Sequence, residues 1–367
     1  MIIAPRPSRS GIALIIVLIV IVVLSTLAFG FAYSMKVETK LARNASFEPD
    51  LEWMARSAVE RAKWILFLES VGPLAKSDSP IMRTFGGPGR TNDLVSTLPI
   101  KNVKHDLGEF DVTVVDLDRK ININRAAGDK LLMQEALSFI GIEDGALTST
   151  IIDSIIDWRD PDDNSGVSGA ESSDYISQPN PGYPPYKAKN GPIDDMSELL
   201  MIRGVTPNIY WGSKASAFST LRKKRTGFEE PVYSMGLMDI FTAISGGKVN
   251  FCTVDERVLQ ALPGIDAMFA AELIKHRKGF DGQDGTLDDV TDLNMLMQLM
   301  GVPTAAQGAP PGGDIGSIIR DQLTPRSLIF EVTVDARIGS IRKQYVALLR
   351  RNPGNPKDIQ TLSMYSR

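Results

Sequence analysis

The sequence holds a single cysteine, Cys252, and only two histidines, His105 and His276. One cysteine excludes an intrachain disulfide and any zinc or redox site built on a Cys-x-x-Cys pair. Two histidines exclude a histidine-rich metal site. The net charge of -4 gives no overall attraction for nucleic acid. What is present, 367 residues of which 43% are hydrophobic and 23% charged, favours about two folded domains.

Recognisable catalytic motifs are missing as well. Residues 166–170, GVSGA, depart from the G-x-S-x-G nucleophile motif because residue 170 is alanine. The sequence contains neither a P-loop nor HExxH. Cys252 lies in a predicted strand, where a packed small residue is expected rather than a nucleophile. We therefore predict that the protein is not an enzyme.

The longest apolar run, residues 12–29, follows a segment that carries Arg6 and Arg9 but no acid. Together with its flanks it gives about 23 residues without charge, which span a bilayer as a helix at about 1.5 Å per residue. Basic residues before the run predict a cytoplasmic N-terminus and place the rest of the chain outside the inner membrane.

Three interpretations of this N-terminus remain open. A secretory signal peptide has a shorter apolar core and an A-x-A-like site, which this run lacks. A plain signal anchor is the second interpretation. In the third, Gly11 just before Ile12 resembles the leader of type IV pilin-like proteins, which a prepilin peptidase cuts after the glycine while the apolar helix is kept.

An amphipathic helix is predicted over residues 34–71, because apolar residues recur at three- and four-residue spacing. These residues are Leu51, Met54, Ala55, Ala58, Val59, Ala62, Ile65 and Leu66. Pro49 either kinks or restarts the helix, and Gly72 with Pro73 ends it.

Strands are predicted at both ends of the remaining chain. Residues 108–118 and 120–124 form two strands, and residues 327–336 and 341–350 form a hairpin. We expect all of them to pair in one antiparallel sheet made of residues 95–124 and 325–352. The fold class is therefore α+β: a long N-terminal transmembrane and amphipathic helix, a small antiparallel sheet, and a large inserted α-helical domain.

The insertion is expected to form two related helical subdomains, residues 125–215 and 249–320. A weak internal repeat supports this division, since KININRAAGDKLL (120–132) parallels KVNFCTVDERVL (248–259). Further helices are predicted at 130–140, 147–158, 195–203 and 285–300, and two short helices within 249–279. LPGIDAMFAAELI (262–274) resembles a helix-hairpin-helix, a signal shared with sterile-alpha-motif-like modules.

Six carboxylates crowd one part of the insertion, and Arg159 is the only base among them. They are Asp157, Asp160, Asp162, Asp163, Glu171 and Asp174. Like charges at such density need solvent or a metal, and oxygen-only ligands from a helix end and an irregular loop suit Ca²⁺. The alternative is a solvated acidic loop whose members cap helices. A second, weaker group comprises Asp281, Asp284, Asp288 and Asp289.

The order and spacing of these segments resemble the minor pseudopilin K of the type II secretion system, the general secretion pathway protein K family. The segments that carry the resemblance are residues 10–24, 120–126, 151–163, 169–175, 184–210 and 249–274. Cleavage after Gly11 makes Ile12 the first residue of the mature chain and Ile16 the fifth. Most pilin-like subunits have a glutamate at that place, where a carboxylate in the membrane needs a partner. The resembled family lacks it, which suits a subunit at the fibre tip.

The resemblance implies a protein-secretion role as a single-pass inner-membrane protein with a periplasmic head, a calcium-binding helical domain and a methylated N-terminus. It implies assembly with I- and J-type minor pseudopilins, the major pseudopilin, prepilin peptidase and the inner-membrane assembly platform. The head is expected to start pseudopilus assembly for export of folded proteins across the outer membrane, with no nucleic acid bound. The alternative is a membrane-anchored DNA-binding protein of an uptake system that uses the helix-hairpin-helix.

Overall fold

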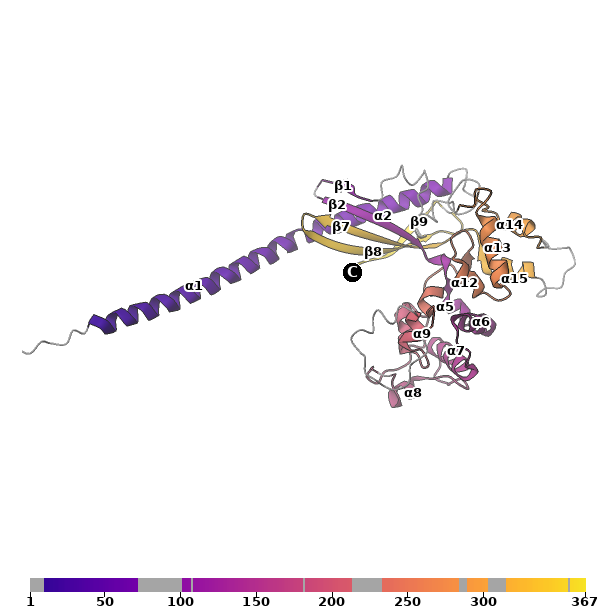
Figure 1. Ribbon diagram of the computed structural model, residues 1–367, viewed down its shortest axis with the longest axis horizontal. Coiled ribbons are helices and arrows are strands. Elements are labelled where there is room, and N and C mark those ends of the chain that lie inside the picture. Colours follow the sequence, from indigo (N-terminus) through magenta and orange to yellow (C-terminus); the bar gives the residue numbers. More distant parts are fainter. Residues whose placement is uncertain are drawn as a thin grey trace, which may run out of the picture.

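The computed structural model shows a head of sheet and helices carried on a long N-terminal helix (Figure 1). It describes residues 10–71, 101–106, 108–180, 182–212, 233–283, 289–302, 315–355 and 357–367.

The N-terminal helix α1 (Ser10–Ser46) projects from the head, and no residue of its apolar window is buried. Ile16 is 55% exposed. The predicted long apolar helix is confirmed, and its length and composition fit a membrane anchor. The helix breaks at Phe47, and α2 (Glu48–Val71) begins with Pro49 in its first turn. Pro49 therefore restarts the helix, because a proline in the first turn removes no helical hydrogen bond.

The inner face of α2 covers the sheet. All eight apolar residues predicted for this face, from Leu51 to Leu66, are buried in one core with the strands. The sheet has five antiparallel strands in the order β1-β2-β7-β8-β9. Their bounds are β1 (Val103–His105), β2 (Gly108–Asp116), β7 (Ile329–Ile338), β8 (Ile341–Arg351) and β9 (Ile359–Ser366). The predicted pairing of the two distant strand regions is confirmed, with Val112 opposite Val334.

One strand prediction is wrong, and one strand of the sheet escaped prediction. Residues 120–124 do not join the main sheet: β3 (Ile121–Asn122) pairs in parallel with β4 (Phe241–Thr242). The chain then turns into α5 (Ile123–Ala126), because the Asn122 side chain accepts a hydrogen bond from the Arg125 backbone N–H at 3.1 Å and caps the helix. The edge strand β9 was not predicted. Its side chains are mostly exposed, so no buried apolar alternation marks it.

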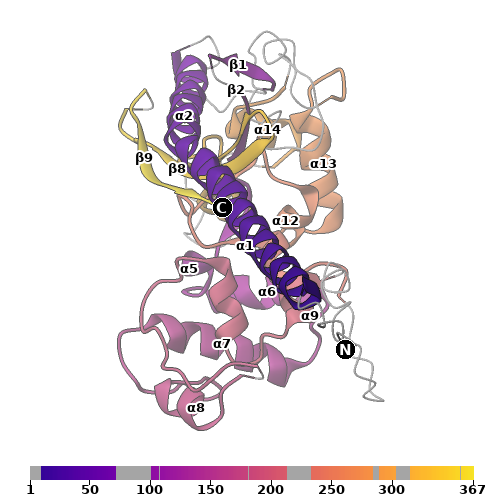
Figure 2. The same ribbon diagram turned by 90° about the vertical axis from the view of Figure 1, so that its left-hand side faces the viewer.

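Helices fill the insertion between β2 and β7, and Figure 2 shows them in two groups, α5 to α9 and α12 to α14. The N-terminal group contains α6 (Lys130–Ile140), α7 (Gly145–Arg159), α8 (Ser172–Ser177), η2 (Met196–Met201) and α9 (Pro207–Trp211). After it come α11 (Leu237–Ile240), β5 (Val249–Asn250), α12 (Glu256–Gln260), α13 (Ala267–Arg277), α14 (Leu293–Leu299), α15 (Ile315–Gln322) and β6 (Leu323–Thr324). The element predicted at 195–203 is a 3₁₀ helix, capped by Asp195. One continuous apolar core runs through both groups. The helix-hairpin-helix character and the two predicted subdomain ranges stay predictions.

A buried polar junction separates this core from the core beneath α2. It lies where β2 ends, and its centre is Asp118, which is 1% exposed. One carboxylate oxygen accepts a hydrogen bond from the Gly246 N–H, and the other accepts from Leu328 N–H at 2.5 Å and Ile329 N–H at 3.2 Å. Asp118 thus joins the chain leaving the sheet to the chain returning to it.

Replacing this carboxylate should loosen the junction. In Asp118→Asn the side-chain NH₂ faces backbone donors, so at least one buried hydrogen bond is lost, at a cost of about 2 kcal/mol. Thermal unfolding of the full chain in detergent should show a lower Tm. Asp106→Asn changes an exposed aspartate on the turn before β2 and should leave Tm unchanged. Equal Tm values for both variants would contradict this role.

Candidate metal centre

Three of the six predicted carboxylates meet at the C-terminal end of α7. Asp157 lies in the last turn of α7, Asp160 follows as its C-cap, and Glu171 is the N-cap of α8. Each offers one oxygen, and these atoms all lie within 4.8 Å of one another. Asp157 and Glu171 are buried, with exposures of 3% and 1%. The loop between the two helices therefore brings distant acids to one buried point.

The loop closes tightly around Asp157 at two glycines. The Gly166 N–H donates to both Asp157 carboxylate oxygens, at 3.1 and 3.0 Å. A Cβ atom on Gly169 would lie 1.8 Å from Asp157 Oδ2, so no larger residue fits there without moving the carboxylate. The GVSGA segment (residues 166–170), which matches the nucleophile motif only in part, thus surrounds the carboxylate of Asp157.

The other three predicted acids have protein partners. Asp162 accepts a hydrogen bond from Asn164 N–H at 2.9 Å, and Asp163 accepts one from Ser172 Oγ at 2.9 Å. Asp174 pairs with Arg203 at 3.2 Å and accepts a hydrogen bond from Glu171 N–H. They shape the loop around the three-carboxylate group (Asp157, Asp160 and Glu171) rather than joining it.

Four buried oxygens at this part of the insertion have no hydrogen-bond donor among the described residues. They are both carboxylate oxygens of Glu171, Oδ1 of Asp160 and Oδ1 of Asn190. Asn190 is held in place by its NH₂ group, which donates to Asp162 O at 2.8 Å and Asp163 Oδ1 at 3.2 Å. Buried oxygens without donors are rare, because desolvation is then uncompensated. A bound cation, or protons on the carboxylates, would give these oxygens the partners that they lack.

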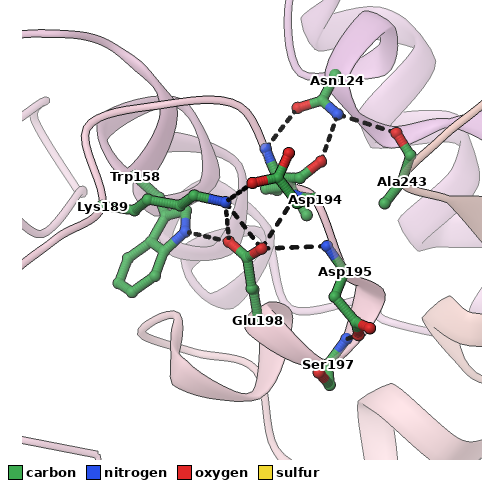
Figure 3. A network of polar contacts seen from close by, with 9 residues as sticks. Asn124, Trp158, Lys189, Asp194, Asp195, Ser197, Glu198 and Ala243 are labelled. Carbon is green, nitrogen blue, oxygen red and sulfur yellow. Dashed lines mark hydrogen bonds and ion pairs between the residues drawn. The ribbon is translucent and has the colours of Figure 1, made fainter. Parts of the chain in front are cut away.

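Asn190 escaped prediction because it lies far from the acids in sequence. Its left-handed backbone, with φ of 49°, and its neighbour Gly191 are the local signal, since asparagine tolerates this conformation in turns. Figure 3 shows how the loop that carries it is fixed: Lys189 Nζ contacts Asp194 at 2.6 Å and Glu198 at 2.9 Å. The Trp158 indole N–H donates to Glu198 Oε2 at 3.3 Å.

The same network reaches the rest of the insertion. Asn124 accepts a hydrogen bond from Ile193 N–H at 2.9 Å and donates to Ala243 O at 3.0 Å. The Trp158 ring meets Tyr175 edge to face, with centroids 5.6 Å apart. The residue next to Asp157 is therefore locked in the core, which fixes the end of α7.

The carboxylates in this group resist ionisation. Burial, reinforced by the charges of Asp157, Asp160 and Asp163, raises the pKa of Glu171 to about 7. Burial also raises the pKa values of Asp157 and Asp160. The pKa of Asp174 is lowered instead, because it accepts the Glu171 N–H and faces Arg203. Crowded, buried carboxylates with raised pKa values are typical of functional sites.

The remaining predicted sites are less informative. Gly11 lies in the first turns of α1, at the start of the same helix as Ile12 and Ile16. Asp284 and Asp288 of the second acidic group lie outside the described residues, while Asp281 accepts a hydrogen bond from Gln283 N–H. Cys252 is buried, as predicted, but it lies in a turn after Asn250 rather than in a strand.

The basic residues of the predicted helix-hairpin-helix are engaged within the protein. In α13, Lys275 and His276 both contact Glu272, at 3.0 and 2.9 Å. Arg277 is buried and donates to the carbonyls of Phe251 and Val254, both at 2.9 Å. These basic side chains thus contact protein oxygens, and nothing in the described geometry favours the DNA-binding alternative.

Comparisons with known proteins agree with the family resemblance found in the sequence. Residues 113–212 match the family model for protein K of the type II secretion system. The fold is similar to a chain in the crystal structure of the GspK-GspI-GspJ complex from the enterotoxigenic Escherichia coli type 2 secretion system, with a TM-score of 0.57 and 15% identity. The match covers 89% of this chain and 99% of that one. No curated protein matches the sequence. The resemblance to protein K is thus confirmed, and neither comparison supports DNA binding.

The raised pKa of Glu171 predicts a pH dependence for the metal-free protein. The folded pKa of about 7 exceeds the ordinary value of 4.5, so the folded state binds the proton more tightly than the unfolded state. The stability that this proton contributes is complete below about pH 4.5 and is lost as pH rises through 7. With a chelator present, Tm should fall between these pH values, and Glu171→Gln should flatten the fall. A Tm profile identical in the variant and the original chain would contradict the assignment.

Proposed function

We propose that this chain, a protein K of the type II secretion system by family model and fold, is the minor pseudopilin at the tip of the pseudopilus. The family match over residues 113–212, together with the fold match over 89% of the chain, carries this proposal. The head lies in the periplasm, and assembly with I- and J-type minor pseudopilins starts the fibre that exports folded proteins. The solved relative is itself part of a complex with GspI and GspJ.

The N-terminal helix supports this position. The exposed apolar side chains of α1 need lipid or neighbouring subunits around them. Ile16 places an apolar side chain where a glutamate would need a positive partner in the membrane. A subunit without that glutamate needs no subunit ahead of it, which suits the first member of a fibre. The role is one of assembly rather than catalysis.

Processing at Gly11 is the direct test of the pseudopilin assignment. In cells with active prepilin peptidase and the cognate secretion system, mass spectrometry of the membrane-extracted chain should give Ile12 as the first residue. Gly11→Val should block the cut, because the leader glycine is replaced, and cells without the peptidase should keep the full leader. An intact Met1 in peptidase-positive cells would refute processing at this glycine.

We also propose that the three-carboxylate group binds Ca²⁺. Asp157, Asp160 and Glu171 supply hard oxygen donors, and the buried Oδ1 of Asn190 adds an amide oxygen of the kind that Ca²⁺ accepts. A divalent cation would satisfy the oxygens that lack donors and favour ionised carboxylates. Its role is to hold the α7–α8 loop closed in the helical insertion.

Calcium should therefore stabilise the full chain at pH 7.5, which raises its Tm. At a Ca²⁺ concentration of 100 times Kd, the free energy of unfolding should rise by about 2.7 kcal/mol. Glu171→Gln should weaken Ca²⁺ binding at least tenfold, because it removes one charge and one ligand. Glu143→Gln is the matched control, since this exposed acid between α6 and α7 lies outside the group and its loop. Tb³⁺ luminescence excited through Trp158 gives a second readout. No Ca²⁺ shift in the unchanged chain would leave only an acidic loop.

A further inference from the structure

The last part of α1, beyond the apolar run, carries a basic face. This stalk, residues 34–46, holds three bases, Lys36, Lys40 and Arg43, and one acid, Glu38. The bases are spaced by four and three residues, so they share one side of the helix, and all three are exposed. Glu38 lies on the opposite side. We call the three bases the basic stripe.

The protein offers the basic stripe no acidic partner among the described residues. Lys36, Lys40 and Arg43 form no ion pair with them, whereas Arg56 of α2 contacts Glu52 one turn earlier at 2.7 Å. Helical side chains meet at three- or four-residue spacing, and no acid of the stalk stands at that distance from a base of the stripe. Figure 1 shows α1 leading away from the head. The stripe is therefore open to a partner outside the chain.

The position of the stripe along the helix matches the headgroup layer of a bilayer. The apolar run ends near Tyr33, which is 64% exposed and is of the kind found at membrane–water interfaces. The headgroup layer is about 5–7 Å thick on each side of the hydrocarbon core. Lys36 lies about 4.5 Å beyond Tyr33 at 1.5 Å per residue, which is within this layer.

The other two bases lie just above the same layer. Lys40 is one turn farther along, and its four-carbon stem lets the ammonium bend back toward the layer, because helical side chains lean toward the N-terminus. Arg43 lies about 15 Å beyond Tyr33, which leaves it within about one Debye length, ~8 Å, of the layer. All three charges thus act on the membrane surface from one side of the helix.

We propose that the basic stripe binds the phosphates of anionic phospholipids in the leaflet from which the stalk emerges. An acidic neighbouring protein would need to be recruited to this level, whereas the headgroup layer is present wherever the apolar run lies in a membrane. Because the stripe occupies one side only, binding sets the depth of the anchor and tilts that side toward the surface. This inference rests on the membrane anchor and not on the position at the fibre tip.

Lipid retention tests the proposal on the full chain. The chain is placed in nanodiscs with equal amounts of phosphatidylglycerol, which is anionic, and phosphatidylcholine, which has no net charge. Native mass spectrometry then counts the lipids that stay bound after release. The unchanged chain should retain phosphatidylglycerol at least tenfold over phosphatidylcholine. The variant Lys36→Gln/Lys40→Gln should lower this preference at least fivefold, since one basic residue near an anionic surface changes binding by about fivefold.

Two control variants separate the stripe from net charge and from helix structure. Lys101→Gln/Lys104→Gln removes the same charge from exposed lysines of the head and should change the preference less than twofold. Lys36→Arg/Lys40→Arg keeps the charge and should keep the preference. Raising NaCl from 50 to 500 mM should weaken the preference of the unchanged chain, because salt screens exposed charges.

The remaining outcomes would overturn the proposal. Equal retention of both lipids by the unchanged chain would leave the stripe to an acidic protein partner. Equal preference in the unchanged chain and in Lys36→Gln/Lys40→Gln would place the lipid contact elsewhere. An equal loss in the Lys101→Gln/Lys104→Gln control would show a general charge effect. None of these results bears on processing at Gly11, so the proposed function is tested separately.

Discussion

The carboxylate of Asp118 is the constraint on which the two halves of the head depend. Among the described residues, the apolar core under α2 and the core of the insertion form two separate clusters. Asp118 bridges them by accepting backbone N–H groups from Gly246, Leu328 and Ile329. A buried carboxylate is tolerated only when such donors surround it. The need to satisfy this charge therefore holds the exit and the return of the chain in one place.

Glu171 shows the opposite condition, and the contrast separates a structural acid from a binding one. Both side chains are almost fully buried, but the described residues offer the Glu171 oxygens no donor. Its neighbours Asp157 and Asp160 add negative charge rather than relieving it. The close approach of Gly166 and Gly169 to Asp157, and the contacts of Lys189, hold these carboxylates in this unfavourable arrangement. Protons on these carboxylates, or a cation of the kind proposed, would offset this charge.

The sequence could reveal those features in which one physical pattern dominates. Apolar spacing located the buried face of α2, and alternation located the β7–β8 hairpin, because burial requires those periods. The crowding of acids pointed to the α7–α8 loop, yet the choice of Asp157, Asp160 and Glu171 depended on chain geometry. Asn190 reaches the acidic loop through contacts with Asp162 and Asp163 across the fold, which local sequence does not encode. Strand β9 and the departure of residues 120–124 from the sheet followed from exposure and from the Asn122 cap, both invisible to hydrophobic alternation.

The proposed metal centre lies apart from the sheet in the arrangement of the head. In Figure 1 the α7 and α8 helices lie at the far end of the insertion, whereas α2, β8 and β9 lie beside the junction with α1. The separate apolar cores mean that ordering the metal loop does not repack the face of the sheet. Calcium bound as proposed would thus stabilise the insertion without altering the face of the sheet that α2 covers.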